Sequence, residues 1–317
     1  MTHKLVALAI LAVVFTPLRA PQGTGQQPTG GGIEIDALFF GRNGEPVRDL
    51  SRDEVEVWIA GYRVPLERFI AVTREDPERS RRALVLILDD ITVDPALVPR
   101  LREAAKQMVA GMGAGDEMAI VALSGDQTKS TTDPATLLRT LDRYGTRASG
   151  VMRPDMLGEQ VLRTIAAISR QLAESGARRR TIVGLGSGWL FDTPLPPPAI
   201  AAGRELGPEW VDAMRAMASA NVTLYVIDAG GVGRSRLPSG DSGFARESGG
   251  LAFTNTNDLK RAAEQIMTEA SSYYILGVSD PPMFRTAPLR EVDIKVKRRG
   301  VTARARRAIA GAPAAPR

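Results

Sequence analysis

A repeated alternation of buried strands and amphipathic helices dominates the chain from Arg82 onward and restricts it to an α/β fold. The runs ALVLIL, MAIVAL, TIVGLG and VTLYVID are apolar throughout, as strands covered on both faces of a sheet are. Helix-like stretches such as PALVPRLREAAKQMVAGM and NDLKRAAEQIMTEA separate or follow these runs, and LAF adds a short fifth strand. The pattern predicts a doubly wound, mostly parallel sheet with helices around it.

β-strand patterns precede and follow this α/β region. Ahead of it, IEIDALFF and VEVWIAGYRVPLERF are separated by the turn-forming stretch GRNGEP. After it, SYYILGV, LREVDIKVKRR and VTARARRAI read as strands. Because isolated hairpins are marginally stable, we expect the segments 33–80 and 272–308 to join into one small β domain beside an α/β domain over 81–271. The tail, 309–317, is expected to be disordered.

Residues 1–20 have the layout of a secretory signal peptide, with a short basic region, the apolar run Leu5–Phe15 and the small residue Ala20. The run is too short to span a bilayer comfortably. Residues 21–32 are rich in Gly, Gln, Pro and Thr, which predicts a flexible linker. We therefore expect an exported protein, periplasmic, cell-surface or extracellular, without stable membrane insertion after cleavage. A retained N-terminal anchor is the alternative.

The residue types that most enzymes use are scarce in this chain. It has no cysteine, and its one histidine, His3, lies in the predicted signal peptide. This excludes Ser-His-Asp and Cys-His catalysis and zinc sites with His or Cys ligands in the exported protein. Carboxylates, hydroxyls, Lys, Arg and oxygen-bound cations remain. Without the signal peptide, 39 basic residues face 36 acidic ones, an excess too small to indicate a nucleic acid partner.

Several segments together resemble the VWFA-related domain family, exported bacterial proteins with a von Willebrand factor type A (VWA) core and a short β extension at each end. GRNGEPVRDLSRDEVEV is similar to the family's turn and acidic strand ahead of the core. NVTLYVIDAGGVG, ESGGLAFTNTNDLKRAAEQI and SSYYILGV are similar in order and spacing to its late signatures. The resemblance covers nearly all of the chain after the signal peptide. It implies a Rossmann-like VWA domain that mediates protein binding or cell adhesion.

The resemblance also implies a place for a metal ion. VWA domains usually hold a divalent cation with Asp-x-Ser-x-Ser after the first strand, a later Thr, and an Asp after the fourth strand. Here Asp89 takes the first position, but Ile91 and Val93 replace the two hydroxyls. Ser187 stands where the later Asp is expected. The adhesion site is therefore degenerate, and we expect no cofactor, with Mg²⁺ at Asp89 as the alternative.

Open α/β sheets bind ligands in a crevice at the carboxyl ends of their strands. The residues expected near that crevice are Asp89, Asp90, Thr92, Asp94, Ser187, Trp189 and Asp192. The structural interpretation of Asp89 and Asp90, which we favour over a metal site, is that they cap the following helix and accept hydrogen bonds from loop amides. Hydrogen bonds alone could still hold a protein partner in the crevice.

Two other functions remain open beside protein binding. The chain could be a structural envelope or assembly component that makes its contacts through the β unit. It could instead be a hydrolase that uses Asp89 and Asp90 as paired carboxylates. Consecutive side chains at a strand end point in different directions, which weakens that pairing, so we expect no enzymatic activity.

Two arginine clusters have two interpretations each. The first is Arg178–Arg180, and the second contains Arg298, Arg299, Arg304, Arg306 and Arg307. Both could attract acidic polymers or lipid headgroups, or they could be solvated charges that protect sheet edges from aggregation. The loop GGVGRS lacks the Gly-Lys-Ser/Thr ending of a phosphate loop, so no nucleotide site is expected.

Overall fold

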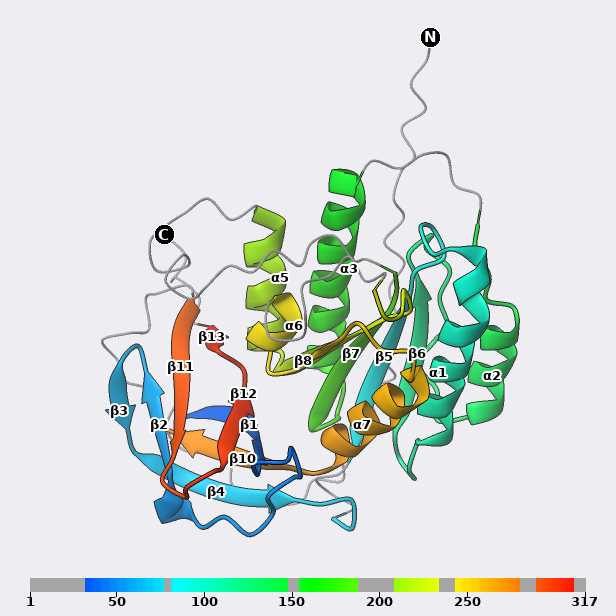
Figure 1. Ribbon diagram of the computed structural model, residues 1–317. Coiled ribbons are helices and arrows are strands. Elements are labelled where there is room, and N and C mark those ends of the chain that lie inside the picture. The colour runs from blue at the N-terminus through cyan, green and yellow to red at the C-terminus, as the bar shows by residue number, and fades with distance from the viewer. Residues whose placement is uncertain are drawn as a thin grey trace.

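The computed structural model of this protein describes residues 32–76, 81–147, 154–187, 208–233, 243–279 and 289–310. A five-stranded parallel sheet in the order β6-β5-β7-β8-β9 forms its centre (Figure 1). The strands are β5 (Arg82–Leu88), β6 (Glu117–Ala122), β7 (Arg179–Gly186), β8 (Val222–Asp228) and β9 (Ala252–Phe253). These are the five runs that the sequence predicts as strands, and the mixed α/β class is confirmed.

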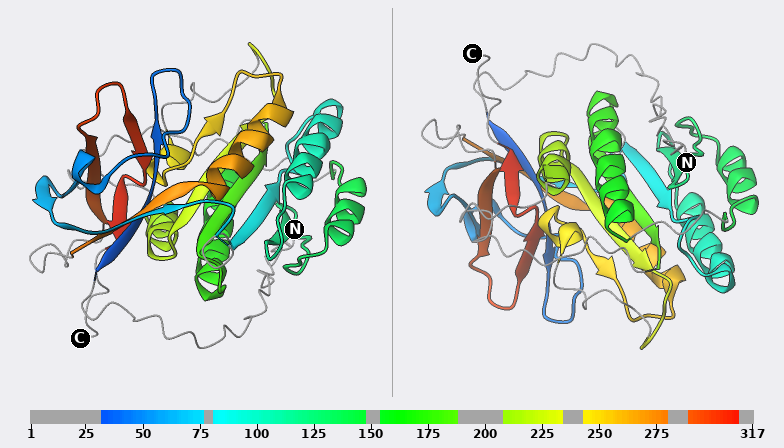
Figure 2. Two further views of the ribbon diagram at one scale, coloured as in Figure 1. Left: turned by 90° about the horizontal axis from the view of Figure 1, so that it is seen from below. Right: turned by 90° about the horizontal axis from the view of Figure 1, so that it is seen from above.

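Helices cover both faces of this sheet (Figure 2). The helices on one face are α1 (Val98–Ala110), α2 (Pro134–Asp142) and α7 (Leu259–Ser271), and those on the other are α3 (Pro154–Glu174) and α5 (Pro208–Ser219). A single turn, α6 (Phe244–Glu247), precedes β9. We refer to the sheet and these helices as the α/β domain.

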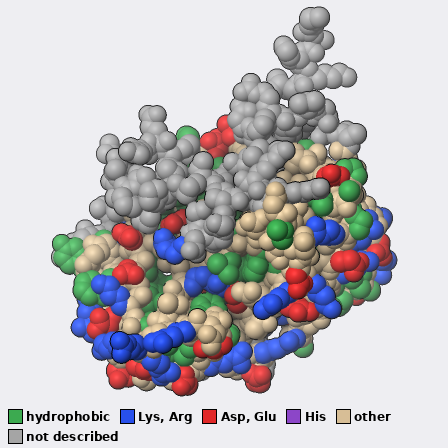
Figure 3. Space-filling model, viewed as in Figure 1, with side chains coloured by type: hydrophobic (Ala, Val, Ile, Leu, Met, Phe, Trp, Pro, Cys, Tyr) green, Lys and Arg blue, Asp and Glu red, His purple; other side chains and the backbone are tan. Residues whose placement is uncertain are grey.

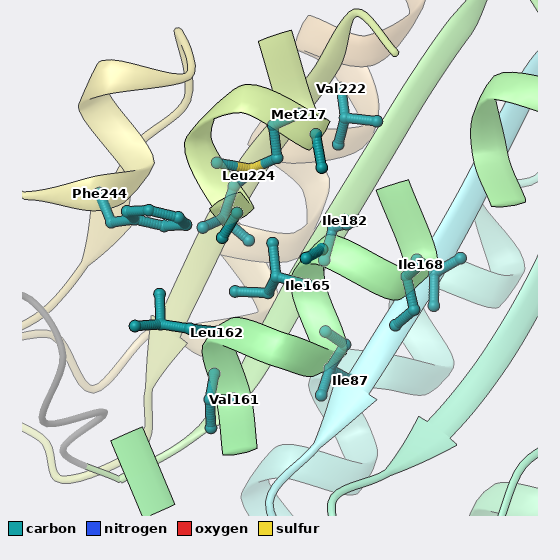
Figure 4. Packing of buried hydrophobic residues seen from close by; sticks show 14 of the residues in the cluster. Ile87, Val161, Leu162, Ile165, Ile168, Ile182, Met217, Val222, Leu224 and Phe244 are labelled. Atoms are coloured by element: carbon teal, nitrogen blue, oxygen red, sulfur yellow. The ribbon is translucent and has the colours of Figure 1, made fainter. Parts of the chain in front are cut away.

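The parallel sheet is buried on both sides, which explains why its strands are apolar without alternation. In β5, Leu86 packs in the cluster beneath α1 and α7, whereas Ile87 packs in the cluster beneath α3 and α5. Figure 4 shows Ile87 and Ile182 of the sheet close to Ile165 of α3. All of these side chains are essentially inaccessible to solvent.

Two antiparallel four-stranded sheets, β12-β1-β10-β4 and β13-β11-β2-β3, form a second unit, the β unit. Its strands before the α/β domain are β1 (Ile33–Phe40), β2 (Val55–Ile59), β3 (Tyr62–Val64) and β4 (Leu66–Val72). Those after it are β10 (Tyr273–Val278), β11 (Leu289–Val296), β12 (Thr302–Ala305) and β13 (Ala308–Ala310). Because β1 pairs with β10 and β12, and β2 with β11, the two ends of the chain build the same sheets.

The C-terminal strands differ from the sequence prediction in two ways. VTARARRAI is not one strand, because the chain leaves the first sheet at Arg306 and joins the second as β13. The Arg306 side chain turns inward and donates to the carbonyl oxygen of Ala218 (3.0 Å) at the end of α5. The predicted disordered tail also begins too early, since Ile309 and Ala310 belong to β13 and pair with β11.

Buried charge joins the β unit to the α/β domain. Asp36 of β1 accepts hydrogen bonds from Arg179 (2.9 Å) and Arg178 (3.0 Å) at the start of β7. Burial opposes the charge of Arg179, but the Asp36 carboxylate, together with smaller contributions from Tyr225 and Tyr273, outweighs it and raises the pKa of that guanidinium. Burial lowers the pKa of Arg306 to about 10. The two sequence interpretations of the arginine clusters are therefore wrong for Arg179 and Arg306, which are neither solvated nor accessible.

A second ionic contact joins the same two parts. Arg304 of β12 pairs with Glu269 of α7, which also accepts a hydrogen bond from the Tyr225 hydroxyl (2.9 Å). Burial, and then the nearby Glu269 carboxylate, raises the pKa of Tyr225.

Among the helices that the structure describes, none is long and apolar enough to cross a membrane.

We predict that Asp36→Asn lowers the free energy of unfolding by about 3–5 kcal/mol, because it leaves buried guanidinium groups without a counter-charge. Urea denaturation measures the loss. The double variant Asp36→Leu/Arg179→Met should recover much of it, because it removes both members of the most buried pair. A single variant within about 1 kcal/mol of the wild type would contradict this role.

A pH-dependent link is expected between the two ends of the chain. Glu54, in the 3-10 turn Arg52–Glu54, accepts from Arg298 (2.7 and 2.8 Å) and from the Ser51 amide, which lowers the pKa of Glu54 to about 2. A depressed carboxylate pKa stabilises the fold above the unfolded value, 4.5, and the contribution disappears as the pH falls toward 2. Melting curves should therefore show a stability difference between wild type and Glu54→Gln above about pH 5 that shrinks at lower pH. A difference independent of pH would contradict the link.

Candidate functional site

The carboxyl ends of β5, β7 and β8 lie at one edge of the parallel sheet and carry Asp89, Ser187 and Asp228. The register places Asp89 and Asp228 on either side of Gly186, the last residue of β7. The strand order reverses between β5 and β7, and doubly wound sheets bind ligands at such a reversal. This edge is therefore the candidate functional site.

Asp89 is almost completely buried and its carboxylate closes the loop that follows β5. One oxygen accepts from the amides of Ile91 (3.0 Å) and Thr92 (2.8 Å), and the other accepts from the Thr92 hydroxyl (2.5 Å). The Asp89 carbonyl oxygen accepts from the Tyr144 hydroxyl (2.7 Å). These are the loop-amide hydrogen bonds that the structural interpretation of Asp89 predicts.

The two apolar replacements in the motif have places in the core. Val93 is 3% exposed and packs beneath α1, and Ile91 packs against the cluster on the other face of the sheet. Helix capping falls to Asp94, whose carboxylate accepts from the Ala96 amide (2.8 Å) at the start of the 3-10 turn Pro95–Leu97 ahead of α1. The loop is thus held by side chains that pack or cap.

Asp90 is also buried but faces the neighbouring strand β6. Its carboxylate accepts from the amide (2.9 Å) and the hydroxyl of Ser124, just after β6. The Arg147 guanidinium lies 3.6 Å away, and the Arg147 amide donates to the Asp90 carbonyl oxygen (2.7 Å). Asp89 and Asp90 therefore bind different partners on different sides of the strand end.

Tyr144, in the segment after α2, is hydrogen-bonded to Asp89 at the end of β5. Its side chain is 7% exposed, and burial, followed by the charges of Asp89 and Asp90, raises the pKa of the phenol. Its carbonyl oxygen accepts from Arg102 of α1 (2.6 Å). The phenol thus stays neutral and donates its proton to the Asp89 carbonyl.

A pocket of about 480 Å³ opens beside Asp90, between β6 and the end of α2. Its lining residues are Leu88, Asp90, Ile120, Ala122, Asp126, Gln127, Thr128, Thr140, Arg143, Tyr144, Gly145 and Arg147. The Arg147 side chain is 58% exposed and pairs with buried Asp90 on one side and with exposed Asp126 on the other. Arg147 thereby connects the buried acid to the surface.

The donor set at this edge does not fit a divalent cation. Within the described residues, no group of three or more His, Cys, Asp or Glu side chains has an arrangement that could hold one. The Asp89 carboxylate already accepts three hydrogen bonds from its own loop, and a cation at Asp90 would lie beside the Arg147 guanidinium. The third acid, Asp228, accepts from the Gly230 amide (2.8 Å).

Five of the seven predicted crevice residues lie in the described part of the chain, and Trp189 and Asp192 lie outside it. Asp89, Asp90 and Thr92 come together at the end of β5, and Ser187 follows β7. Asp94 is exposed and serves as a cap.

The residues that sequence reasoning missed are Ser124, Tyr144, Arg147 and Asp228. Asp228 has the same signal as Asp89, an acid that ends a buried apolar strand, and could have been found. The other three are distant in sequence from the acids that they contact, and Ser124 is separated from Asp90 by 34 positions. No local pattern marks them.

Comparisons with known proteins leave the family open. No family model matches the sequence, and no curated protein matches it. Similar solved structures include an aerotolerance-related membrane protein from Bacteroides fragilis with multiple mutations to serines (16% identity, TM-score 0.37, covering 58% of this chain and 98% of that one). Another is a mutant of the PilB minor pilin from Streptococcus sanguinis (11% identity, TM-score 0.39, covering 75% of this chain and 88% of that one). A third is the human COPII-coat protein Sec24c (7% identity, TM-score 0.33, covering 74% of this chain and 44% of that one). Structural similarities this low carry no functional argument.

We predict that Thr92→Val lowers the free energy of unfolding by about 1–3 kcal/mol, because one buried Asp89 oxygen loses the hydroxyl that donates to it. Thr92→Ser keeps a hydroxyl and is the matched control. Urea denaturation compares them. A Thr92→Val variant as stable as the wild type would show that the hydrogen bond to Asp89 does not contribute.

Proposed function

We propose that this chain is an exported, non-catalytic protein whose VWA-like domain binds a protein partner at the carboxyl edge of its sheet without a metal ion. The observation that carries the proposal is the pocket beside Asp90, where Arg147 joins a buried carboxylate to the surface. The strand order and the VWFA-related sequence segments support the VWA-like assignment. The signal-peptide pattern of residues 1–20, which lie outside the described residues, supports export.

The pocket offers the two kinds of contact that protein interfaces combine. Ala122 and the methyl groups of Thr128 and Thr140 contribute partly exposed apolar surface, and Arg143 and Arg147 contribute guanidinium donors. Arg147 is already oriented by two carboxylates, so a partner that accepts from it would immobilise little additional side-chain freedom. A partner carboxylate or main-chain carbonyl is the complementary group.

The engagement of the acids supports a non-catalytic role. General acid–base chemistry needs a carboxyl group that can exchange a proton with a substrate. Asp89 and Asp90 instead accept hydrogen bonds from amides and hydroxyls and face different sides of β5, so they do not form a carboxylate pair. The same hydrogen bonds support metal independence.

Partner binding can be tested by chemical crosslinking of residues 21–317 to extracellular and envelope proteins of the source cells. The pocket variant is Arg143→Gln/Arg147→Gln, and the matched control is Arg63→Gln/Arg68→Gln on the β unit. We expect a partner that wild type and control retain equally, with or without EDTA, and that the pocket variant retains about tenfold less, the loss of one charge-assisted contact. Retention unaffected by the pocket variant, but lost when the β unit is altered, would favour a structural component instead.

Metal independence has its own test, isothermal titration of the protein with Mg²⁺, Mn²⁺ and Ca²⁺ beside the Asp89→Ala variant. We expect no saturable heat with either protein and no shift in their melting temperatures, because the protein's own donors occupy the carboxylates. Saturable binding by the wild type that Asp89→Ala abolishes would refute this part of the proposal.

A further inference from the structure

A second groove, of about 560 Å³, lies between the β unit and the α/β domain. Its lining comes from β11, β12, the turn after β1, and the α6 and α7 side of the α/β domain. Phe40, Asp293, Thr302 and Gln265 are among its lining residues. In Figure 3, Lys and Arg side chains are visible in the region where the β unit meets the α/β domain. We call this the β11–β12 groove.

The groove lies where two consecutive strands separate into different sheets. Among the described strands, β12 pairs with β1 alone, so its other side is a sheet edge. β11 pairs with β2 over Val292–Val296, but with β13 only over Leu289–Glu291. The half of β11 beyond Glu291 therefore has a strand on one side only.

The backbone of β11 presents hydrogen-bonding groups toward this open side. The Val292 amide points away from β2 and is already used, because it donates to the Arg307 carbonyl oxygen (2.7 Å); the open part of the edge begins beyond it. Because successive residues of a strand direct their N–H and C=O groups to opposite sides, Ile294 presents its groups on the same side as Val292. An extended peptide recognises such edges by adding a strand.

The charge of the lining selects among extended peptides. Five arginines and one acid, Asp293, line the groove, and the arginines are Arg42, Arg246, Arg304, Arg306 and Arg307. Glu269 and Glu247 offset Arg304 and Arg307. Arg306 is buried and held by backbone carbonyls, so the accessible positive charge of the lining comes from Arg42 and Arg307.

We propose that the β11–β12 groove binds an extended acidic peptide segment of a protein partner, whose main chain pairs with the open edge of β11 and whose carboxylates face Arg42 and Arg307. This site is separate from the carboxyl edge of the parallel sheet. The proposal therefore stands or falls independently of the function proposed above.

The test uses a fluorescein-labelled peptide of about eight residues in which Thr and Glu alternate, so that the carboxylates share one face of the strand. Fluorescence anisotropy should show saturable binding to residues 21–317. Arg42→Gln/Arg307→Gln should weaken it about tenfold or more, and Arg63→Gln/Arg68→Gln, which removes two exposed arginines of β3 and β4, should leave it unchanged. If the double variant melts early, Arg42→Gln alone, on an exposed turn, takes its place.

Two further peptides separate strand pairing from simple charge attraction. A Thr-Gln version should not bind, because it lacks the carboxylates. A version of the Thr-Glu peptide that is N-methylated at alternate residues should bind about tenfold more weakly, because it cannot complete the main-chain hydrogen bonds. Absence of binding, equal binding by the groove variant and the control, or indifference to N-methylation would each overturn the proposal.

Discussion

The attachment of the β unit to the α/β domain depends on one buried carboxylate, that of Asp36. Arg178 and Arg179 donate hydrogen bonds to it. Its charge also stabilises the cationic form of Arg306. Burial disfavours the cationic forms of Arg179 and Arg306, and the Asp36 carboxylate opposes that effect at both. The pKa of Arg179 is raised, whereas that of Arg306 still falls to about 10. Removing it would leave like charges close together in a region from which water is largely excluded. The strand that carries Asp36, β1, lies between β12 and β10. Asp36 therefore links the interior of this sheet to the α/β domain through Arg179.

The candidate site is connected to this junction through a single strand. β7 begins at Arg179, which binds Asp36, and ends at Gly186, between Asp89 and Asp228. It is flanked on both sides by parallel strands and covered on both faces by helices. The position of the carboxyl edge relative to the β unit is therefore fixed by a rigid, fully paired element.

Sequence reasoning succeeded where the determining contacts are local. The strands β5–β8 are apolar throughout because helices cover both faces, and composition alone shows this. The bonds of Asp89 were predictable because its acceptors bind amides two and three residues away. Arg179 was misinterpreted because its partner is separated from it by 143 positions, and a charged residue reads as exposed until its counter-charge is known. The break in VTARARRAI likewise depends on carbonyl groups of α5.

The chain enters and leaves the α/β domain at neighbouring strands, and this determines how the molecule would bear a pulling force. β4 leads into the domain, β10 leads out of it, and the two lie side by side in one sheet. The outer ends of the described chain, β1 and β13, also belong to the β unit. Tension between those ends would load the interstrand hydrogen bonds of the β unit first. The parallel sheet, with its carboxyl edge, would stay outside the mechanical path and keep its geometry under load.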